Sequence, residues 1–460
     1  MSKPEITHLG AERAVTGSCH LLQINGMNIM VDCGMTYGEE RASSMERWPV
    51  KPSQVDYLFL THAHVDHIGR VPDLIQKGFE GEIITTHATK DLIHPMLEDA
   101  IGFSGKTERE KEGFLRILDD LSWGFEYNQS FDLKNGVRFK LGRAGHILGS
   151  SFIRFECSNP EFAVIFSGDL GGNNSPLLPD PDIPDPCDLL VLESTYGDRI
   201  HEDRQQRIHR LGKVLSHALS DGGKVFIPAF ALGRAQELIY EMDRLFSNPE
   251  WQYKFPALNP KSPIPVFLDS PLGLEITKHY SRLSRYWDKE ARDLLRQGDH
   301  PLDFDYLYAV KSHGDHLRLI ETECPSIIIA GSGMCTGGRI INHLKEGLEN
   351  PKNDLIFAGF QAKGTPGRDI IKYHKRPEGY VRLDGKRVVI NAHVFLLGGY
   401  SAHADQKGLV NWVESMAEKP GEIKLVHGEP EAQRMLSKIL RDKGHRLQWH
   451  KVSLIHHLSI

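Results

Sequence analysis

The sequence predicts an α/β protein with two domains: a sandwich of β-sheets flanked by helices, and a parallel sheet wrapped by helices. Three observations predict this fold class. The chain has 460 residues, which is long enough for more than one buried core. Short strands separated by Gly, Asp and Asn turns dominate the part before residue 203, and helices alternate strictly with strands after it.

The first part of the chain is expected to supply most of the sandwich. Its apolar, turn-bounded runs predict strands at 19–23, 27–32, 55–60, 81–85, 137–141, 151–156, 163–166 and 189–193. Helical periodicity covers 65–77, where Ile68, Val71 and Leu74 share one stripe, and a longer helical stretch covers about 89–123.

The second part alternates between the two kinds of element. Helices are expected at 204–220, 232–246, 275–297 and 338–348, and strands at 224–228, 265–268, 326–330 and 354–360. Strands return at 387–397, followed by a helix at 406–416, a strand at 423–426, a helix at 431–443 and a final strand around 455–458. We therefore predict one domain split between residues 1–202 and 385–460, with a second domain inserted at 203–384.

Composition narrows the function classes only a little. The net charge of -6 argues against a uniformly basic surface, although it leaves a local basic groove open. No apolar run reaches the length of a membrane span, so we expect no membrane partner. The opening residues lack the apolar core of a secretory signal, which predicts a cytoplasmic protein with six reduced cysteines. The sequence is compatible with a homodimer.

The 24 histidines are more informative, because three of them crowd one loop. Residues 61–69 read Thr-His-Ala-His-Val-Asp-His-Ile-Gly, directly after a predicted strand. Imidazole and carboxylate groups are donors that zinc accepts. The alternative is a solvated loop that happens to be rich in histidine, but crowded imidazoles gain nothing structurally without a metal.

The spacing within this loop suggests two ions. His62 and His64 lie two apart on extended backbone and can point to the same side, whereas Asp66 and His67 lie one turn further on. Four ligands on one loop cannot close on a single tetrahedral ion, so further ligands must come from elsewhere. Polar residues beside glycine at three other strand ends offer them, although each alone would more often be a turn residue: His146, Asp169 and His427.

The loop motif HxHxDH resembles that of the metallo-β-lactamase superfamily, and later motifs resemble its β-CASP nucleases over essentially the whole chain. The residues that carry the resemblance are Asp32, His62, His64, Asp66, His67, His146, Asp169, Glu193, His403 and His427. The resemblance implies an αββα metallo-β-lactamase sandwich with an inserted β-CASP domain.

The resemblance also implies a ligand set and catalytic roles. One zinc ion takes His62, His64 and His146, the other takes Asp66, His67 and His427, and Asp169 bridges the two Zn²⁺ ions, with Mn²⁺ as an alternative metal. We expect Asp32 to orient a ligand histidine, although it could also be only a turn residue before Gly34. The expected catalytic residues are His403 as the acid for the leaving group, Glu193 as its support, and Asp66.

Three Gly-rich turns in the inserted domain favour a phosphate polymer as substrate. Backbone N–H groups, helix N-termini and arginines form anion sites. The expected RNA- or phosphate-binding residues are Arg234, Ser270, Ser332, Gly333, Arg339, Gly364 and Thr365. In the resemblance, members with histidine at the position of His427 act on RNA, whereas the DNA cross-link repair branch has an aliphatic residue there.

We therefore predict a zinc-dependent ribonuclease, similar to compact prokaryotic relatives of the pre-mRNA cleavage and polyadenylation endonuclease, and favour endonucleolytic cleavage. A 5'-exoribonuclease of the RNase J type is the main alternative. A small-molecule metallo-hydrolase would not need the inserted domain, and a flavodiiron oxidoreductase would need an appended flavin domain. A noncatalytic RNA-binding subunit would typically have lost metal ligands.

Overall fold

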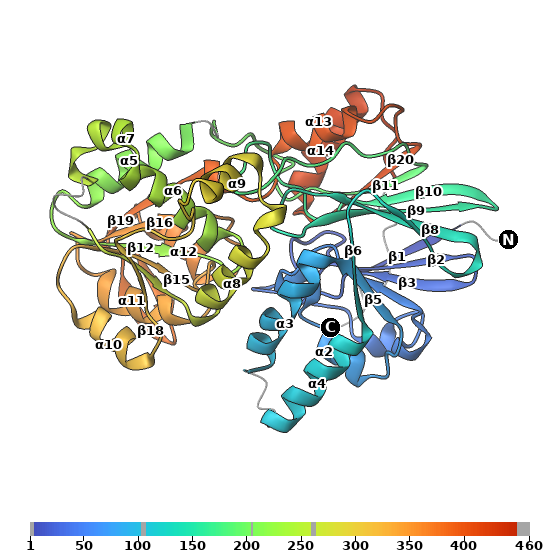
Figure 1. The fold of residues 1–460 in the computed structure, drawn as a ribbon, viewed down its shortest axis with the longest axis horizontal. Coiled ribbons are helices and arrows are strands. Elements are labelled where there is room, and N and C mark those ends of the chain that lie inside the picture. The colour runs from blue at the N-terminus through green and yellow to red at the C-terminus, as the bar shows by residue number, and fades with distance from the viewer. Residues whose placement is uncertain (1–3, 103–106, 204–205, 259–263, 449–460) are drawn as a thin grey trace.

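The protein has two lobes, a β-sandwich lobe and an inserted lobe, which lie at the right and left of Figure 1. The computed structural model describes residues 4–102, 107–203, 206–258 and 264–448. No helix among these residues is long and apolar enough to cross a membrane.

Two six-stranded sheets face one another in the sandwich lobe. The first sheet has the order β1 (Glu5–Gly10), β2 (Cys19–Ile24), β3 (Met27–Val31), β4 (Tyr57–Phe59), β5 (Glu82–Thr86) and β6 (Ser122–Phe125). The second has the order β20 (Glu422–Val426), β11 (Leu189–Glu193), β10 (Glu161–Phe166), β9 (Ser151–Ser158), β8 (Val137–Arg143) and β7 (Ser130–Asp132).

Aromatic side chains fill the space between these sheets. Phe59 of the first sheet meets Phe139 and Phe155 of the second edge-to-face, with ring centroids 5.0 and 4.7 Å apart. Aromatic pairs prefer this geometry, and each pair contributes roughly 0.5–1.5 kcal/mol beyond its buried area. The inward residues of both sheets thus form one continuous core.

Helices cover the outer faces of both sheets. The first sheet packs against α1 (Val65–Ile68), α2 (Val71–Gln76), α3 (His87–Gly102) and α4 (Glu108–Leu121), and the second packs against α13 (Gln406–Glu414) and α14 (Pro430–Asp442). The layers therefore run helix, sheet, sheet, helix, which confirms the predicted αββα fold class.

The inserted lobe contains a third sheet in which every neighbouring pair of strands is parallel. Its order is β14 (Leu307–Ala309), β13 (Val266–Asp269), β15 (Ser326–Ala330), β12 (Lys224–Pro228), β16 (Asp354–Phe357) and β19 (His393–Leu396). Its central strands β12 and β15 are buried on both faces, as parallel sheets require.

Helices wrap both faces of this third sheet, and a short hairpin lies beside it. The helices are α5 (Arg207–Ala218), α6 (Arg234–Ser247), α7 (Pro249–Lys254), α8 (Pro271–Arg282), α9 (Lys289–Arg296), α10 (His313–Glu321), α11 (Arg339–Gly347) and α12 (Pro366–Tyr373). The hairpin consists of β17 (Tyr380–Leu383) and β18 (Lys386–Val389).

The chain returns to the sandwich at α13, which packs on the second sheet, and then forms β20, which pairs in parallel with β11. The return comes later than the predicted residue 385, because β19 pairs with β16 and so belongs to the third sheet. Sequence alternation indicates strands at 387–397 but cannot tell to which sheet they belong. The predicted boundaries 1–202, 203–384 and 385–460 therefore need this shift, and the extent of each domain stays a prediction.

Four predicted elements differ in detail. The helix expected at 275–297 is divided into α8 and α9. The helix expected at 65–77 breaks between α1 and α2, at Gly69 and Arg70. The stretch expected at 89–123 comprises α3 and α4 and ends where β6 begins at Ser122. The final strand expected around 455–458 lies outside the described residues.

The histidine-rich loop is held in place by backbone contacts with the segment after β3. The Cys33 N–H donates to the His67 carbonyl at 2.7 Å, and the Met35 N–H donates to the Val65 carbonyl at 3.0 Å. Gly34 lies between these two contacts. A Cβ added there would lie 1.6 Å from the Asp66 carbonyl oxygen, so the close approach requires glycine.

We therefore expect Gly34→Ala to lower the free energy of unfolding by about 2–4 kcal/mol, because backbone must move to relieve the clash. Gly113→Ala in α4 is the matched control, since a Cβ there meets nothing within 4 Å. It should be neutral or slightly stabilising. Urea denaturation of both variants measures the difference, and equal stability of the two would contradict the required close approach.

Candidate metal centre

Three imidazoles converge at the end of β4. His62 and His64 follow this strand, and His146 comes from the loop after β8. The Nε2 atoms of His62 and His146 each lie 3.1 Å from His64 Nδ1. Burial lowers the pKa of all three below its ordinary value, so their rings are neutral and offer lone pairs. We call these residues the first donor set.

A second donor set consists of Asp66, His67 and His427. The first turn of α1 carries Asp66 and His67, while His427 directly follows β20 in the left-handed region at φ 47°. The rings of His67 and His427 have centroids 5.0 Å apart, and His427 Nε2 lies 3.8 Å from Asp66 Oδ2. Among the described residues, the buried Nε2 atoms of both histidines make no hydrogen bond.

The carboxylate of Asp169 lies between the two sets, after β10. Its Oδ2 lies 3.6 Å from His62 Nε2 and 3.6 Å from His146 Nε2. The same oxygen lies 3.3 Å from His67 Nε2, and Oδ1 lies 3.4 Å from His427 Nδ1. The structure thus brings together all seven residues that the sequence assigned to the metals.

The separations between these donor atoms fit divalent cations. Ligands bound at about 2.0–2.2 Å to a tetrahedral ion lie roughly 3.2–3.6 Å from one another. The atoms of the first donor set and Asp169 Oδ2 lie 3.1–3.6 Å apart where they face each other. Neutral imidazoles at these separations cannot all hydrogen-bond to one another, whereas a shared cation satisfies every lone pair.

Asp32 lies behind the second donor set. His67 Nδ1 donates to Asp32 Oδ2 at 2.7 Å, and the Thr61 N–H donates to Asp32 Oδ1 at 2.9 Å. The carboxylate is fully buried. This contact fixes the ring orientation of His67 so that Nε2 points toward Asp169, which is the geometry expected of a carboxylate that orients a ligand.

A second histidine–carboxylate pair borders the first donor set. His403 Nδ1 lies 3.1 Å from Glu193 Oε1, and His403 Nε2 lies 3.8 Å from Asp169 Oδ2. The backbone N–H groups of Leu170 and Thr195 donate to Glu193 and hold it in place. Burial alone lowers the pKa of His403, but the charges of Glu193 and Asp169 outweigh it and raise that pKa above its ordinary value.

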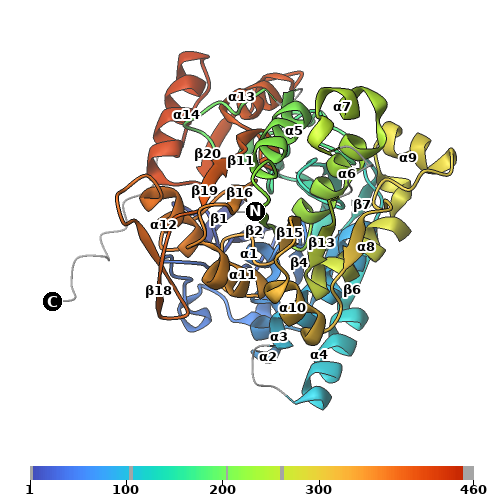
Figure 2. The ribbon, with the colours of Figure 1, turned by 90° about the vertical axis from the view of Figure 1, so that its left-hand side faces the viewer.

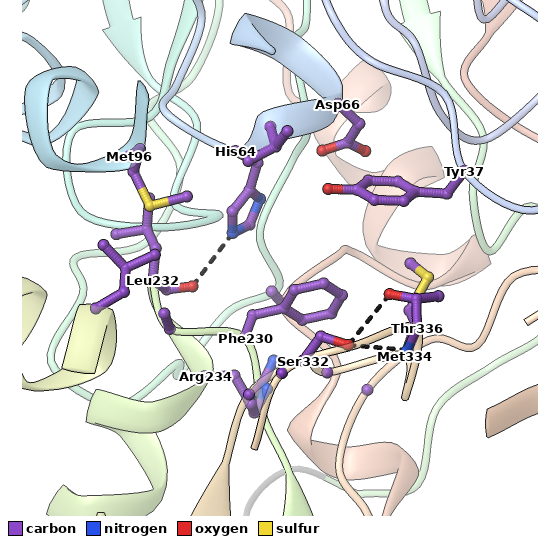
Figure 3. A pocket seen from close by; sticks show the side chains of 18 of the residues that line it. Tyr37, His64, Asp66, Met96, Phe230, Leu232, Arg234, Ser332, Met334 and Thr336 are labelled. Atoms are coloured by element: carbon purple, nitrogen blue, oxygen red, sulfur yellow. Dashed lines mark hydrogen bonds between the residues drawn. The ribbon is translucent and has the colours of Figure 1, made fainter. Parts of the chain in front are cut away.

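The metal centre opens onto a cavity of about 610 Å³ between the two lobes. Figure 3 shows His64 and Asp66 on one wall and Phe230, Arg234 and Ser332 on the opposite wall. Five of the predicted phosphate-binding residues line this cavity: Arg234, Ser270, Ser332, Gly333 and Arg339. Gly364 and Thr365 do not; Thr365 is buried and caps α12, and Gly364 packs against Glu39.

The inserted lobe touches a metal-centre residue directly. His64 Nε2 lies 3.3 Å from the carbonyl oxygen of Leu232, the contact drawn as a dashed line in Figure 3. Nδ1 of the same ring faces His62 and His146, the other members of the first donor set. A carbonyl oxygen can only accept a hydrogen bond, so this contact places the proton of the neutral His64 ring on Nε2 and leaves the lone pair of Nδ1 for a metal.

Sequence reasoning missed a third cluster, behind the opposite wall. Asp269 Oδ2 accepts hydrogen bonds of 2.6 Å from both His316 Nδ1 and His343 Nε2. Arg339 Nη1 donates to Asp269 Oδ1 at 2.7 Å. These short contacts are hydrogen bonds that hold Arg339 at the cavity. The spacing of Arg339 and His343, four apart on α11, was the available signal; His316 offered none.

Comparison with known families assigns three stretches of the chain. Residues 13–211 match the metallo-β-lactamase superfamily, residues 235–370 match the β-CASP domain, and residues 387–452 match the RNA specificity domain of Zn-dependent metallo-hydrolases.

Curated relatives cover nearly the whole chain. Ribonuclease TTHA0252 of Thermus thermophilus is 37% identical over 95% of this chain and 96% of its own length. Transcription termination factor FttA of Methanocaldococcus jannaschii is 30% identical over 92% of this chain and 67% of its length. Cleavage and polyadenylation specificity factor 73 of Drosophila melanogaster is 30% identical over 92% of this chain and 60% of its length.

The fold also matches a crystal structure of a protein of unknown function from Enterococcus faecalis V583, at a TM-score of 0.55 and 11% identity over 98% of each chain. That likeness concerns the fold alone. The family matches imply a site for divalent metal, in agreement with the donor sets. The chain therefore belongs to the metallo-β-lactamase superfamily and, within it, to the β-CASP ribonucleases.

Proposed function

We propose that this chain hydrolyses RNA phosphodiester bonds with two zinc ions and cuts within the RNA chain. One observation carries the proposal: Asp169 lies within 3.3–3.6 Å of histidine nitrogens of both donor sets, at the wall of a cavity that a second lobe covers. A shared carboxylate suits ions about 3.5–4 Å apart, the arrangement of two-metal phosphodiester hydrolysis. The RNA specificity match and the ribonuclease named among the relatives support RNA as the substrate.

The roles of the chain's own residues follow from their contacts. His62, His64 and His146 would hold one ion, Asp66, His67 and His427 the other, and Asp169 both. When bound, the two ions supply Lewis-acid stabilisation of phosphoryl oxygens and make a water molecule more acidic. Asp32 keeps His67 oriented, and the Leu232 carbonyl does the same for His64.

His403 is the proton donor in this proposal. Cleavage expels a ribose oxygen that needs a proton, and an imidazole with a raised pKa can supply one near neutral pH. The hydrogen bond to Glu193 supports the role, because it leaves Nε2 of His403 directed toward the metal centre. Asp66 contributes as a ligand that remains partly exposed to the cavity.

The opposite wall supplies anion contacts. The guanidinium of Arg339 is held by Asp269, and that of Arg234 pairs with Glu237, so both groups are fixed before substrate arrives. The hydroxyl oxygen of Ser270 accepts the Gly273 N–H, which leaves its own proton available for a phosphate oxygen. The Ser332 hydroxyl accepts the Thr336 N–H and also lies 3.1 Å from Thr336 Oγ1, so it is held at the cavity wall.

The mode of cleavage separates this proposal from a 5'-exoribonuclease of the RNase J type. Digestion of matched 5'-end-labelled and internally labelled RNA distinguishes the two. Endonucleolytic action yields labelled oligonucleotides from both substrates, and a circular RNA is cut as well. Release of mononucleotides with an uncut circular RNA would instead identify the exonuclease. A cytoplasmic location and a homodimer stay predictions from the sequence.

We expect Asp169→Asn to lose metal and activity together. Removing this charge leaves two divalent cations facing each other with weaker compensation in a buried site. Metal content should fall below two ions per chain, and cleavage should fall by about 100-fold or more. Elemental analysis and RNA cleavage measure both quantities. Asp132→Asn, with a carboxylate that is 86% exposed on β7, is the control and should change neither.

Unchanged metal content and rate in Asp169→Asn would rule out the shared-carboxylate assignment. Treatment with a chelator provides a second check. It should abolish cleavage by the unmodified protein, and added Zn²⁺ or Mn²⁺ should restore it, with the more effective ion identifying the preferred metal.

His403→Ala should slow RNA cleavage by about 10²- to 10⁴-fold, because general acid catalysis typically contributes that much. Both ions and RNA affinity should be retained. A phosphodiester with a good leaving group needs no protonation, so its cleavage should recover much of the rate in the variant. Loss of metal from His403→Ala, or no advantage for the activated substrate, would make His403 a ligand or a structural residue.

A further inference from the structure

Positive charge gathers on one segment of an otherwise acidic chain. Residues 363–387 contain eight Lys and Arg residues against three Asp and Glu residues, although the whole chain has a net charge of -6. This segment forms α12 and the β17–β18 hairpin, which packs on α12. Figure 2 shows α12 and β18 together at one edge of the inserted lobe.

Five of these eight cations are exposed and lack a carboxylate partner in the described part of the chain: Lys372, Lys375, Arg376, Arg382 and Arg387. Lys363 and Lys386, in contrast, lie 3.8 Å from Glu429 and Glu346. On an ordinary solvated face, cations are paired with carboxylates or lie far apart. The accumulation of unpaired cations on this segment therefore favours a polyanionic ligand.

The hairpin contains a like-charge pair that weakens it. Arg382 of β17 is the direct cross-strand neighbour of Arg387 on β18, and both side chains are exposed. Like charges in directly opposed positions destabilise a hairpin. A bound phosphate between the two guanidinium groups would turn this repulsion into an attraction, because arginine binds phosphate with two parallel hydrogen bonds.

Aromatic rings alternate with these cations. The Arg387 guanidinium lies 4.4 Å from the ring centroid of Tyr380, a side chain that is 43% exposed. Arg376 and Lys372 lie 4.9 and 5.1 Å from the ring centroid of Tyr373. Rings and guanidinium planes offer flat faces on which unpaired bases stack, whereas an acidic peptide would use the charges alone.

The N-terminal end of α12 lies beside the cavity. The N–H of Gly367, in the first turn of α12, donates to the carbonyl of Met334, which lines the cavity. Lys363, just before α12, lies beside Glu429, two residues after His427. A strand that leaves the metal centre on this side therefore meets α12, whose eight residues extend about 12 Å, and then the hairpin.

We propose that α12 and the β17–β18 hairpin form a second RNA-binding surface, which holds single-stranded RNA outside the cavity. The inference rests on the proposed ribonuclease function and extends it: this surface would make the protein favour long unpaired RNA over short oligonucleotides. Phosphates contact the exposed arginines, and bases stack on Tyr380 and Tyr373.

The test compares a triple variant, Arg376→Gln, Arg382→Gln and Arg387→Gln, with the unmodified chain on two RNAs. One RNA has about 20 nucleotides and the other has about four, enough for the cavity alone. Binding of phosphorothioate-linked RNA is followed by fluorescence anisotropy, so that the result does not depend on cleavage. KM and kcat are measured in parallel with ordinary RNA.

We expect the triple variant to bind the long RNA about 10-fold more weakly at moderate salt and to lower the salt dependence of log affinity by about 2 units. KM for the long RNA should rise with kcat unchanged, and the short RNA should be unaffected. Tyr380→Ala should weaken long-RNA binding by about 5-fold or more through lost stacking. The triple variant should unfold no earlier on heating, because it removes the Arg382–Arg387 repulsion.

The control variant removes three other exposed cations, Arg109→Gln, Arg116→Gln and Lys134→Gln, on α4 and before β8. An equal loss of affinity in this control would overturn the proposal, because the effect would then be one of net charge. So would an unchanged affinity for long RNA or an equal loss on the short RNA. If the unmodified chain binds long RNA through these residues but cleaves none, the proposed ribonuclease function fails while the binding surface stands.

Discussion

The site depends on one buried carboxylate. Asp169 is 2% exposed, and five imidazoles have a nitrogen within 4 Å of its oxygens: His62, His67, His146, His403 and His427. These rings come from segments up to 365 residues apart, as their numbering from 62 to 427 shows. Such a cluster cannot form unless the strands that carry it are already aligned, so the sandwich has to be completed before the centre exists.

The alignment comes from adjacent strands of the second sheet. Strands β10, β11 and β20 are parallel neighbours, and Asp169, Glu193 and His427 stand at or just after their carboxyl ends. Side chains at the ends of parallel neighbours meet at one edge of the sheet, which is where ligands gather in α/β proteins. The residues of the inserted lobe lie between β11 and β20 in the sequence. Because β20 pairs with β11, the chain brings His427 beside Asp66 after this long insertion.

The inserted lobe covers this edge of the second sheet and also contacts residues of the sandwich lobe. The Leu232 carbonyl contacts His64, the Leu148 N–H lies within hydrogen-bonding distance of Tyr280 OH, and His279 Nδ1 lies 2.7 Å from Asp91 Oδ2. The first of these contacts reaches a metal-centre residue, so a movement between the lobes would disturb the centre itself. The position of the inserted lobe and the orientation of the His64 ring are therefore linked.

The sequence predicted the local part of this arrangement better than the distant part. His62, His64, Asp66 and His67 stand within six residues, so spacing and donor chemistry alone indicated a metal loop. The partners His146, Asp169 and His427 each resembled a turn residue when taken alone, and only the need of the loop for more donors made them candidates. The family likeness then divided them between two ions, because sequence separation hides which strands are neighbours. The same limit assigned residues 387–397 to the sandwich domain, although β19 pairs with β16 in the third sheet. It also left Asp269, His316 and His343 unconnected, since each comes from a different element.

The cluster of Asp269, His316 and His343 in the inserted lobe has a counterpart in the sandwich lobe. Asp269 ends β13 just as Asp169 follows β10, and both carboxylates line the same cavity. Asp169 gathers donors for divalent cations on one wall, and Asp269, fixed by two histidines, holds the Arg339 guanidinium at the other. Each sheet thus uses a buried anion to fix positive charge at its edge. With divalent ions held by the donor sets, a phosphodiester between the walls would meet positive charge on both sides, and the inserted lobe would supply the Arg339 side of that arrangement.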